Sequence, residues 1–292
     1  MTTSGSKPTW LVFAPLVFLG LWSGGYVAAK YGLRFAEPMT FLSLRYASVM
    51  VIMLVLFALV RPPLPKRSAD WVHLAIVGFL IQSVYFGMCY LAFREGIAVG
   101  SLALIFSLQP VLVGLVAPGW AGESVKRQTW LGLALGLLGA VMVIVARSSI
   151  EVPSVIALLF ALLALIGIAG GSLWEKRFGL SHHPVTANLV GYTAGLLGVV
   201  PFMFWLETMQ VQWAGGLVLS LAYLTIGNSI IAIGLLLAMI RAGDVSKVSS
   251  LFFMVPPLAA LFAWLILDEL MPVAAWGGFV IAALGVWMAT KK

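Results

Sequence analysis

Residues 121–132 read AGESVKRQTWLG, and residues 267–278, which lie 146 positions later, read LDELMPVAAWGG. The offset superimposes Trp130 on Trp276 and leaves a glycine two residues after each tryptophan. It also superimposes the following pairs: Gly25 and Gly171, Lys30 and Lys176, Pro38 and Pro184, Tyr46 and Tyr192, Pro110 and Pro256, Glu123 and Glu269, Gly132 and Gly278, and Gly139 and Gly285. The period is half of the 292-residue chain, so the sequence is an internal duplication.

The composition is that of a protein whose solvent is lipid. Hydrophobic residues make up 62% of the chain and charged residues only 9%, and the mean hydropathy is +1.08. Soluble domains carry about 25% charged residues, so a water-soluble fold could not bury this much apolar surface. The 11 Trp and 7 Tyr residues suit bilayer interfaces. We interpret the net charge of +7 as topology signals in loops and expect no nucleic-acid partner, and a single cysteine excludes a disulfide framework.

Ten apolar stretches each have close to the roughly 20 residues that cross a bilayer as a helix. They lie at residues 9–29, 37–60, 70–93, 99–119, 128–146, 153–174, 184–206, 213–239, 246–267 and 272–289. We therefore expect an all-α integral membrane protein with ten transmembrane helices in a single membrane domain. The first stretch also resembles a cleavable signal peptide, with Val27-Ala28-Ala29 as the cleavage site. Because its repeat partner is a retained helix, we expect the first stretch to be retained as well.

Lysine and arginine are distributed unequally between the two sides that ten crossings would define. If the N-terminus is cytoplasmic, the cytoplasmic side holds Lys7, Arg61, Lys66, Arg67, Lys126, Arg127, Lys176, Arg177, Arg241, Lys247, Lys291 and Lys292. The opposite side then holds Lys30, Arg34, Arg94 and Arg147. This bias follows the positive-inside rule and predicts that both termini are cytoplasmic.

Five helices per unit is an odd number, so the second unit would start on the opposite side of the membrane from the first. We expect the two units, residues 1–147 and 148–292, to be inverted repeats related by a pseudo-two-fold axis in the membrane plane. Such repeats are typical of transporters that hold a substrate near the midplane and open to one side at a time. The duplication therefore predicts alternating access.

Matching local patterns occur in the two units. The first unit contains Leu21-Trp22-Ser23-Gly24, Pro38, Phe41, Arg45-Tyr46, Tyr90-Leu91-Ala92-Phe93, Gly96, Gly100-Ser101, Pro110, Gly122-Glu123, Trp130, Gly132 and Gly139. The second contains Ala242-Gly243, Ser249-Ser250, Pro256-Pro257, Asp268-Glu269, Trp276, Gly278 and Gly285. Over essentially its whole length the chain resembles the ten-helix EamA-type members of the drug/metabolite transporter superfamily, and in particular the YddG-type exporters of aromatic amino acids. It departs from their pattern at Ala169-Gly170-Gly171-Ser172, where an aromatic residue is common.

Arg45 is the one Lys or Arg inside an expected helix, whereas we expect all ten acidic residues at or near helix ends. An intramembrane charge is costly and is presumed functional by default. Two roles stay open for Arg45: a structural partner for a helix end or carbonyl, or a contact for a substrate carboxylate or a gate. Because no buried acid is evident to carry a proton, the sequence favours facilitated export or coupling through the substrate. We expect Glu123 and Glu269 to be interfacial and His73 to be structural.

Neutral polar and aromatic side chains are more numerous inside the expected helices, where lipid-facing positions rarely hold amides. We expect the substrate cavity to be lined by Trp22, Ser23, Tyr26, Gln82, Tyr85, Cys89, Ser107, Tyr223, Asn228, Ser250 and Phe253. Aromatic rings with amide and hydroxyl donors suit a zwitterion that carries an apolar ring. The alternative role for these polar groups is hydrogen bonding between helices. Unlike residues at matched positions, such as Arg45 and Gly191, are where a single substrate would be recognised.

Pro110 and the pair Pro256-Pro257 lie mid-way along matched expected helices. Proline removes a backbone donor and clashes with the preceding turn, so it kinks a helix. We expect these prolines to be hinges that open and close the two ends of the protein, and a static kink is the alternative.

Small residues recur four positions apart in the last expected helix of each unit. The spacings Gly132-x-x-x-Gly136 and Gly278-x-x-x-Ala282 allow close approach of helix backbones. They favour packing inside the bundle over a dimer interface, so we expect a monomer or a weak homodimer.

Together these features predict a bacterial inner-membrane exporter of amino acids, above all the aromatic ones phenylalanine, tryptophan and tyrosine, and of related metabolites. Its partners would be a small-molecule substrate and membrane lipid, with no nucleic acid, cofactor or metal. Two alternatives stay open: a broad-specificity efflux transporter for drugs and cations, and a channel or lipid scramblase. We do not expect an enzyme, because no nucleophile–base pair or metal-ligand cluster falls at membrane depth.

Overall fold

The computed structural model describes residues 10–97, 102, 105–122, 125–147, 154–178, 182–243, 248–267 and 273–290. The regular elements in these residues are helices, apart from one isolated antiparallel bridge between Ala36 and Val211. Five continuous helical stretches in the described residues are long and apolar enough to cross a membrane: Pro38–Val60, Ser68–Arg94, Val155–Phe178, Pro184–Leu206 and Gly215–Ala242.

Apart from the 3₁₀-helix η3, the named helices of the first half match those of the second in order and in type. The first half contains α1 (Trp10–Gly32), α2 (Pro38–Val60), α3 (Ser68–Gly78), η1 (Phe79–Gly87), α4 (Met88–Arg94), α6 (Gln109–Ala121) and α7 (Arg127–Arg147). The second contains α8 (Val155–Phe178), α9 (Pro184–Leu206), α10 (Gly215–Ala222), η2 (Tyr223–Ala232), α11 (Ile233–Ala242), η3 (Ser250–Met254), α13 (Val255–Leu267) and α14 (Val273–Thr290). Both η1 and η2 are π-helices set between two α-helices, so the third apolar segment of each half has the same irregular core.

Proline fixes the start of equivalent helices. Pro38 opens α2 and Pro184, 146 positions later, opens α9, because proline at the first helical position has no hydrogen bond to lose. The residue before each proline is extended, and the His183 Nδ1 also accepts a hydrogen bond from the Val185 N–H at 3.3 Å. The chain therefore enters α2 and α9 with the same backbone geometry.

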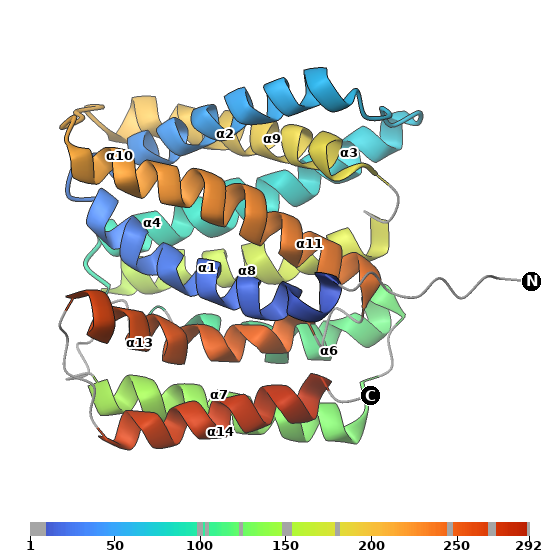
Figure 1. Cartoon of the computed structure of the whole chain (residues 1–292), viewed down its shortest axis with the longest axis vertical. Coiled ribbons are helices and arrows are strands. Elements are labelled where there is room, and N and C mark those ends of the chain that lie inside the picture. The colour runs from blue at the N-terminus through green and yellow to red at the C-terminus, as the bar shows by residue number, and fades with distance from the viewer. Residues whose placement is uncertain are drawn as a thin grey trace, which may run out of the picture.

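The helices run side by side, roughly perpendicular to the longest axis of the molecule (Figure 1). The α7–α14 pair forms one end of its long axis, and α2 packs on α9 near the other. The start of α1 and the end of α14 both lie on the right-hand side of the view in Figure 1. We call this side the Asp70 end, since the chain enters α3 there, and the opposite side, where α2 begins, the Glu37 end.

Glycines set the contact between α7 and α14. A Cβ added at Gly132 would lie 2.4 Å from the Ala289 nitrogen, and one added at Gly139 would lie 2.2 Å from the Ala282 nitrogen. Because an early residue of α7 meets a late residue of α14, the two helices are antiparallel. Each small-residue motif thus packs on other small residues of the opposite helix: Gly132 meets Gly285 and Ala289, and Gly139 meets Gly278 and Ala282.

The prolines expected as mid-helix kinks lie at helix breaks inside the expected spans 99–119 and 246–267. Pro110 is the second residue of α6 and follows a turn at Ser107 and Leu108, while Pro256 is the second residue of α13 and follows the 3₁₀-helix η3. Proline is tolerated in a first turn, whereas a helix interior is disrupted by it, so each helix restarts just before its proline. The Gln109 Nε2 donates to the Ser249 Oγ at 3.2 Å and joins the two breaks.

Candidate functional site

A buried cavity of about 20 Å³ lies between α1, α2, α4 and the two π-helices, and we call it the Arg45 cavity. It is lined by Trp22, Gly25, Tyr26, Ala29, Arg45, Tyr85, Phe86, Cys89, Tyr90, Phe93, Leu224 and Asn228. Six of these were expected at the site from the sequence: Trp22, Tyr26, Arg45, Tyr85, Cys89 and Asn228. A volume of this size admits ordered water but not an amino acid, so the described conformation is closed.

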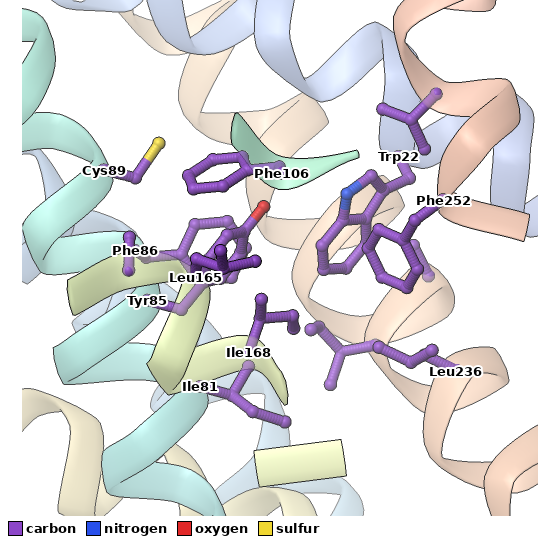
Figure 2. Packing of buried hydrophobic residues seen from close by; sticks show 14 of the residues in the cluster. Trp22, Ile81, Tyr85, Phe86, Cys89, Phe106, Leu165, Ile168, Leu236 and Phe252 are labelled. Atoms are coloured by element: carbon purple, nitrogen blue, oxygen red, sulfur yellow. The ribbon is translucent and has the colours of Figure 1, made fainter. Parts of the chain in front are cut away.

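Aromatic rings form one wall of the Arg45 cavity. Trp22 and Tyr85 point toward each other from α1 and η1, and their rings stack with centroids 6.1 Å apart (Figure 2). The hydroxyl groups of Tyr26 and Tyr85 lie 3.3 Å apart, and the Phe86 ring packs on Tyr85 at 4.7 Å. Offset and tilted ring pairs at these distances are stabilising, so the wall is pre-shaped for another flat apolar group.

Arg45 supplies the charge of the cavity. Its side chain is fully buried, its Nε donates to the Ser229 Oγ at 2.6 Å, and its Cζ lies 4.5 Å from the centre of the Phe86 ring. Neither terminal amino group, Nη1 nor Nη2, has a hydrogen-bond partner among the described residues. A buried guanidinium left in this state is costly, and a bound carboxylate would satisfy it through two parallel hydrogen bonds.

Close packing between α1 and η2 brings an amide to the same cavity. A Cβ added at Gly25 would lie 1.9 Å from the Asn228 Nδ2, so a larger residue there would displace this amide from its position. The Nδ2 group donates to the Leu21 carbonyl at 3.4 Å, and the Asn228 Oδ1 has no partner within the described part of the chain. A free amide oxygen is an acceptor suited to an ammonium group.

A second cavity of about 20 Å³ is the counterpart of the first under the 146-residue offset, and we call it the Glu175 cavity. Four of its lining residues match lining residues of the Arg45 cavity: Gly78 with Leu224, Gln82 with Asn228, Gly191 with Arg45, and Glu175 with Ala29. Tyr46 and Tyr192, which also match, lie between the halves with ring centroids 5.5 Å apart. The two cavities are therefore equivalent in position and opposite in chemistry.

Glu175 is a functional candidate that the sequence analysis did not identify. The expected helix ended at residue 174, but α8 continues to Phe178, and the Glu175 side chain is fully buried against Arg241 of α11. The expectation that no acid is buried was therefore wrong. One signal for the longer helix is present in the sequence: Lys176 and Arg177 follow Glu175, and basic residues are favoured in the last turn of a helix.

The remaining residues expected at the site lie elsewhere in the bundle. Gln82 lines the Glu175 cavity, Ser23 is buried in α1, and the Tyr223 hydroxyl donates to the Leu21 carbonyl at 3.2 Å. Ser107, Ser250 and Phe253 are buried around the helix breaks, where Phe253 packs on Gly136 of α7. Their roles stay predictions, and Glu123 and Glu269 fall outside the described residues.

Reciprocal carboxylate contacts tie the two halves together at the Glu37 end. Glu207 accepts hydrogen bonds from the Met39 N–H, the Thr40 N–H and the Thr40 hydroxyl at 2.6–2.8 Å. Glu37 accepts from the N–H and the hydroxyl of Thr208, both at 2.9 Å. Each glutamate thus satisfies backbone donors on the other half of the chain, and we call this set the Glu37 latch.

The Glu37 end also opens into a larger cavity of about 750 Å³, lined by both loops of the latch and by Arg34 and Arg94. Phe93 lines both this cavity and the Arg45 cavity. The Phe93 ring therefore lies between the Arg45 cavity and the larger cavity at the Glu37 end.

Comparison with known proteins identifies the relatives of the chain. The profile described as the EamA-like transporter family matches residues 9–145 and again residues 155–291. A crystal structure with a TM-score of 0.82 covers 98% of this chain and 99% of its own at 20% identity, and this likeness shows the fold alone.

Three curated relatives align along nearly the full chain. An uncharacterized transporter, YvbV, of Bacillus subtilis is 24% identical, with 97% of this chain and 92% of its own covered. A probable amino-acid metabolite efflux pump of Escherichia coli is 22% identical, with 94% and 92% covered. An uncharacterized inner membrane transporter, YedA, of Escherichia coli is also 22% identical, with 92% and 87% covered.

Proposed function

Because the chain belongs to the EamA-like transporter family, we propose that it exports amino acids, above all aromatic ones, across a bacterial inner membrane. The similarity to a probable amino-acid metabolite efflux pump supports the substrate class, and the similarity to an inner membrane transporter supports the location. The proposal includes alternating access between inverted repeats, each with five membrane crossings.

The proposed topology has both termini in the cytoplasm and ten crossings in total. It makes the Asp70 end cytoplasmic and the Glu37 end external. The start of α1 and the end of α14 lie at the same end of the bundle, as an even number of crossings requires (Figure 1). The antiparallel contact of α7 with α14 is the arrangement that inverted copies would give.

The observation that carries the substrate proposal is the buried, unpaired guanidinium of Arg45 in an aromatic cavity. Its two free amino groups match a carboxylate, and the rings of Trp22, Tyr85 and Phe86 match an apolar side chain. The free Asn228 Oδ1 offers an acceptor for the α-ammonium group. An aromatic amino acid presents all three groups at once.

The same charge argues against the two alternatives. A lipophilic cation would meet Arg45 without a described carboxylate to offset the repulsion, so drug and cation efflux fits the cavity poorly. A channel or scramblase needs a continuous path, whereas the closed cavities and the Glu37 latch suit a carrier that binds its cargo.

Counterflow in proteoliposomes tests the proposal. Vesicles loaded with unlabelled phenylalanine should transiently accumulate external labelled phenylalanine, and tryptophan and tyrosine in the lumen should substitute for it. Phenethylamine, which lacks the carboxylate, and phenylalaninamide, which masks it, should fail to drive counterflow. Failure of every amino acid to exchange would overturn the proposal, and exchange driven by phenethylamine would overturn the role of the carboxylate.

A further inference from the structure

Glu175 combines burial with an unfilled hydrogen-bonding position. One carboxylate oxygen accepts from the Arg241 Nε, whereas Oε2 is buried without a partner among the described residues. The Arg241 Nη2 is likewise buried and unpartnered there, although its Nη1 donates to the His182 carbonyl at 3.1 Å. Glu175 also lines a cavity with room for water, through which a proton can approach its carboxyl group.

The other ionisable groups around α8 are engaged with other partners. His73 accepts from the Trp174 indole, the Asp70 carboxylate lies 3.9 Å from the His182 Nε2, and the Tyr192 hydroxyl donates to the Ser229 carbonyl. On α8 itself, Lys176 donates to the Ile240 and Gly243 carbonyls, and Arg177 donates to the Trp120 carbonyl. On η1 and α4, Tyr85 and Cys89 line the Arg45 cavity. Among the described residues, Arg241 is the group paired in charge with Glu175.

Two opposing effects act on the Glu175 carboxyl. Burial favours the neutral acid, whereas the adjacent guanidinium favours the carboxylate. Any movement that separates α8 from α11 removes the second effect and leaves the first. The affinity of Glu175 for a proton is therefore coupled to the distance between these two helices.

We infer that Glu175 is a proton-binding site that couples export to proton entry, with the Glu175–Arg241 pair closing the Asp70 end. This inference rests on the proposed transport function. In the step, a hydronium ion breaks one of its O–H bonds and becomes water while its proton forms an O–H bond on the carboxylate, and the pair loses its charge attraction. The α8 and α11 ends then part, the carboxyl O–H bond breaks as the proton passes to a cytoplasmic water molecule, and the pair re-forms once the substrate is bound. Only these O–H bonds change.

A proton gradient across proteoliposomes tests the inference. Uptake of labelled phenylalanine into vesicles with an acidic lumen should exceed the equilibrium level, by about tenfold per pH unit for one coupled proton. A sodium gradient imposed at equal pH should have no effect. A wild-type protein that exchanges phenylalanine but ignores the pH gradient, or that responds to sodium in its place, would overturn the coupling and leave the proposed function intact.

Two variants separate a proton site from a structural ion pair. Glu175→Gln should keep counterflow and lose accumulation driven by the pH gradient. The double variant Glu175→Gln with Arg241→Gln removes both members of the pair, so it leaves no unpaired buried charge. It should likewise keep counterflow and lose accumulation driven by the pH gradient. Glu95→Gln is the matched control, because Glu95 lies outside both cavities and pairs only with Arg94 at 3.5 Å in the described structure.

The comparison of counterflow with accumulation driven by the pH gradient decides the result. Gradient-driven accumulation that persists in both variants would overturn the inference. So would a loss of counterflow in the double variant with an unchanged unfolding temperature, because Glu175 would then serve substrate binding and not coupling. The expected result is intact counterflow with accumulation reduced to the equilibrium level.

Discussion

At the scale of single residues, the two cavities differ because the duplicated positions hold different side chains. Arg45 and Leu224 line one cavity, and their equivalents in the other are Gly191 and Gly78. A Cβ added at Gly78 would lie 2.2 Å from the Gly191 Cα, so the helices meet directly where the first cavity holds a charged side chain. The duplicated scaffold therefore keeps its shape while only one copy carries the cation.

Removal of the Arg45 guanidinium should weaken substrate binding more than it weakens folding. Charge-assisted hydrogen bonds are worth about 1.5–3 kcal/mol, so Arg45→Gln should raise the KM for phenylalanine by about tenfold or more. Arg45→Lys should recover part of the affinity, because a lysine retains the positive charge. It cannot donate to Ser229 and at the same time bind a carboxylate through two hydrogen bonds. Initial rates of counterflow against substrate concentration measure this.

A control substrate identifies the cause of this loss. Arg45→Gln should also narrow the preference for phenylalanine over phenylalaninamide, since the amide lacks the charge that Arg45 would bind. Equal preference ratios in the variant and the wild type would assign Arg45 a structural role.

At the scale of elements, irregular helices gather where the halves meet. The π-helices η1 and η2 each present a backbone carbonyl to a tyrosine of the same half: the Tyr46 hydroxyl donates to the Gln82 carbonyl at 2.8 Å and the Tyr192 hydroxyl to the Ser229 carbonyl at 2.7 Å. Breaks before α6 and α13 add a second pair of irregular sites. Non-helical backbone at membrane depth is tolerated where protein or a cavity satisfies it, and π and 3₁₀ segments often mark functional hinges.

The proline-containing breaks should set the rate of transport. Pro110→Ala and Pro257→Ala remove the rings that prevent the helices from extending through the breaks, so each should lower the maximal rate with little change in KM. The double variant should be slower than either. Transport kinetics in proteoliposomes measure this, with Pro201→Ala in the exposed part of α9 as the control. Unchanged rates in all three variants would rule out the hinge role.

The glycine contact between α7 and α14 should be sensitive to a single methyl group. Gly132→Ala would place a Cβ against the α14 backbone, and overpacking of this kind costs about 1–3 kcal/mol. We expect a lower unfolding temperature in detergent, measured by the fluorescence of the tryptophans. Gly277→Ala on α14 is the control, because a Cβ there has no neighbour within 4 Å. Equal unfolding temperatures for the two variants would show that the contact does not stabilise the fold.

At the scale of the whole molecule, each end has its own set of contacts, which join the two halves at the Glu37 end and two helices of the second half at the Asp70 end. The Glu37 latch joins the α1–α2 and α9–α10 loops, and at the Asp70 end the Glu175–Arg241 pair joins α8 to α11. An inverted arrangement allows one set of contacts to break while the other persists, which is the requirement for alternating access. The Arg45 cavity between the two ends is the position where a substrate would be enclosed.

Cross-linking of the Glu37 latch should stop transport reversibly. We expect Glu37→Cys combined with Thr208→Cys, treated with a short cleavable bifunctional thiol reagent, to lose export and counterflow, because the external end can no longer open. Cleavage of the linker should restore both activities. The single variants treated in the same way are the controls, and Cys89 is buried away from the reagent. Undiminished flux through the cross-linked double variant would contradict alternating access.

The sequence by itself determined the solvent and the repeat. A chain that is 62% hydrophobic must face lipid, and the recurrence of Pro38 at Pro184 and of Tyr46 at Tyr192 reveals the duplication, because both signals are carried by local composition and spacing. The aromatic side of the candidate site could also be predicted, since Trp22 and Tyr85 lie well inside expected helices. Helix ends were less certain, and one extra turn of α8 was enough to hide Glu175.

Only the tertiary structure decided which side chains meet. Arg45 bonds to Ser229, 184 positions away, and Glu175 pairs with Arg241, 66 positions away. Periodicity within one helix cannot reveal such partners, because they depend on how separate helices rotate and pack against each other. The same packing places a cation in one cavity and an ion pair at its counterpart, and the helices are broken just before the prolines. Sequence spacing sets the faces of each helix, but the contacts between helices set the chemistry of the site.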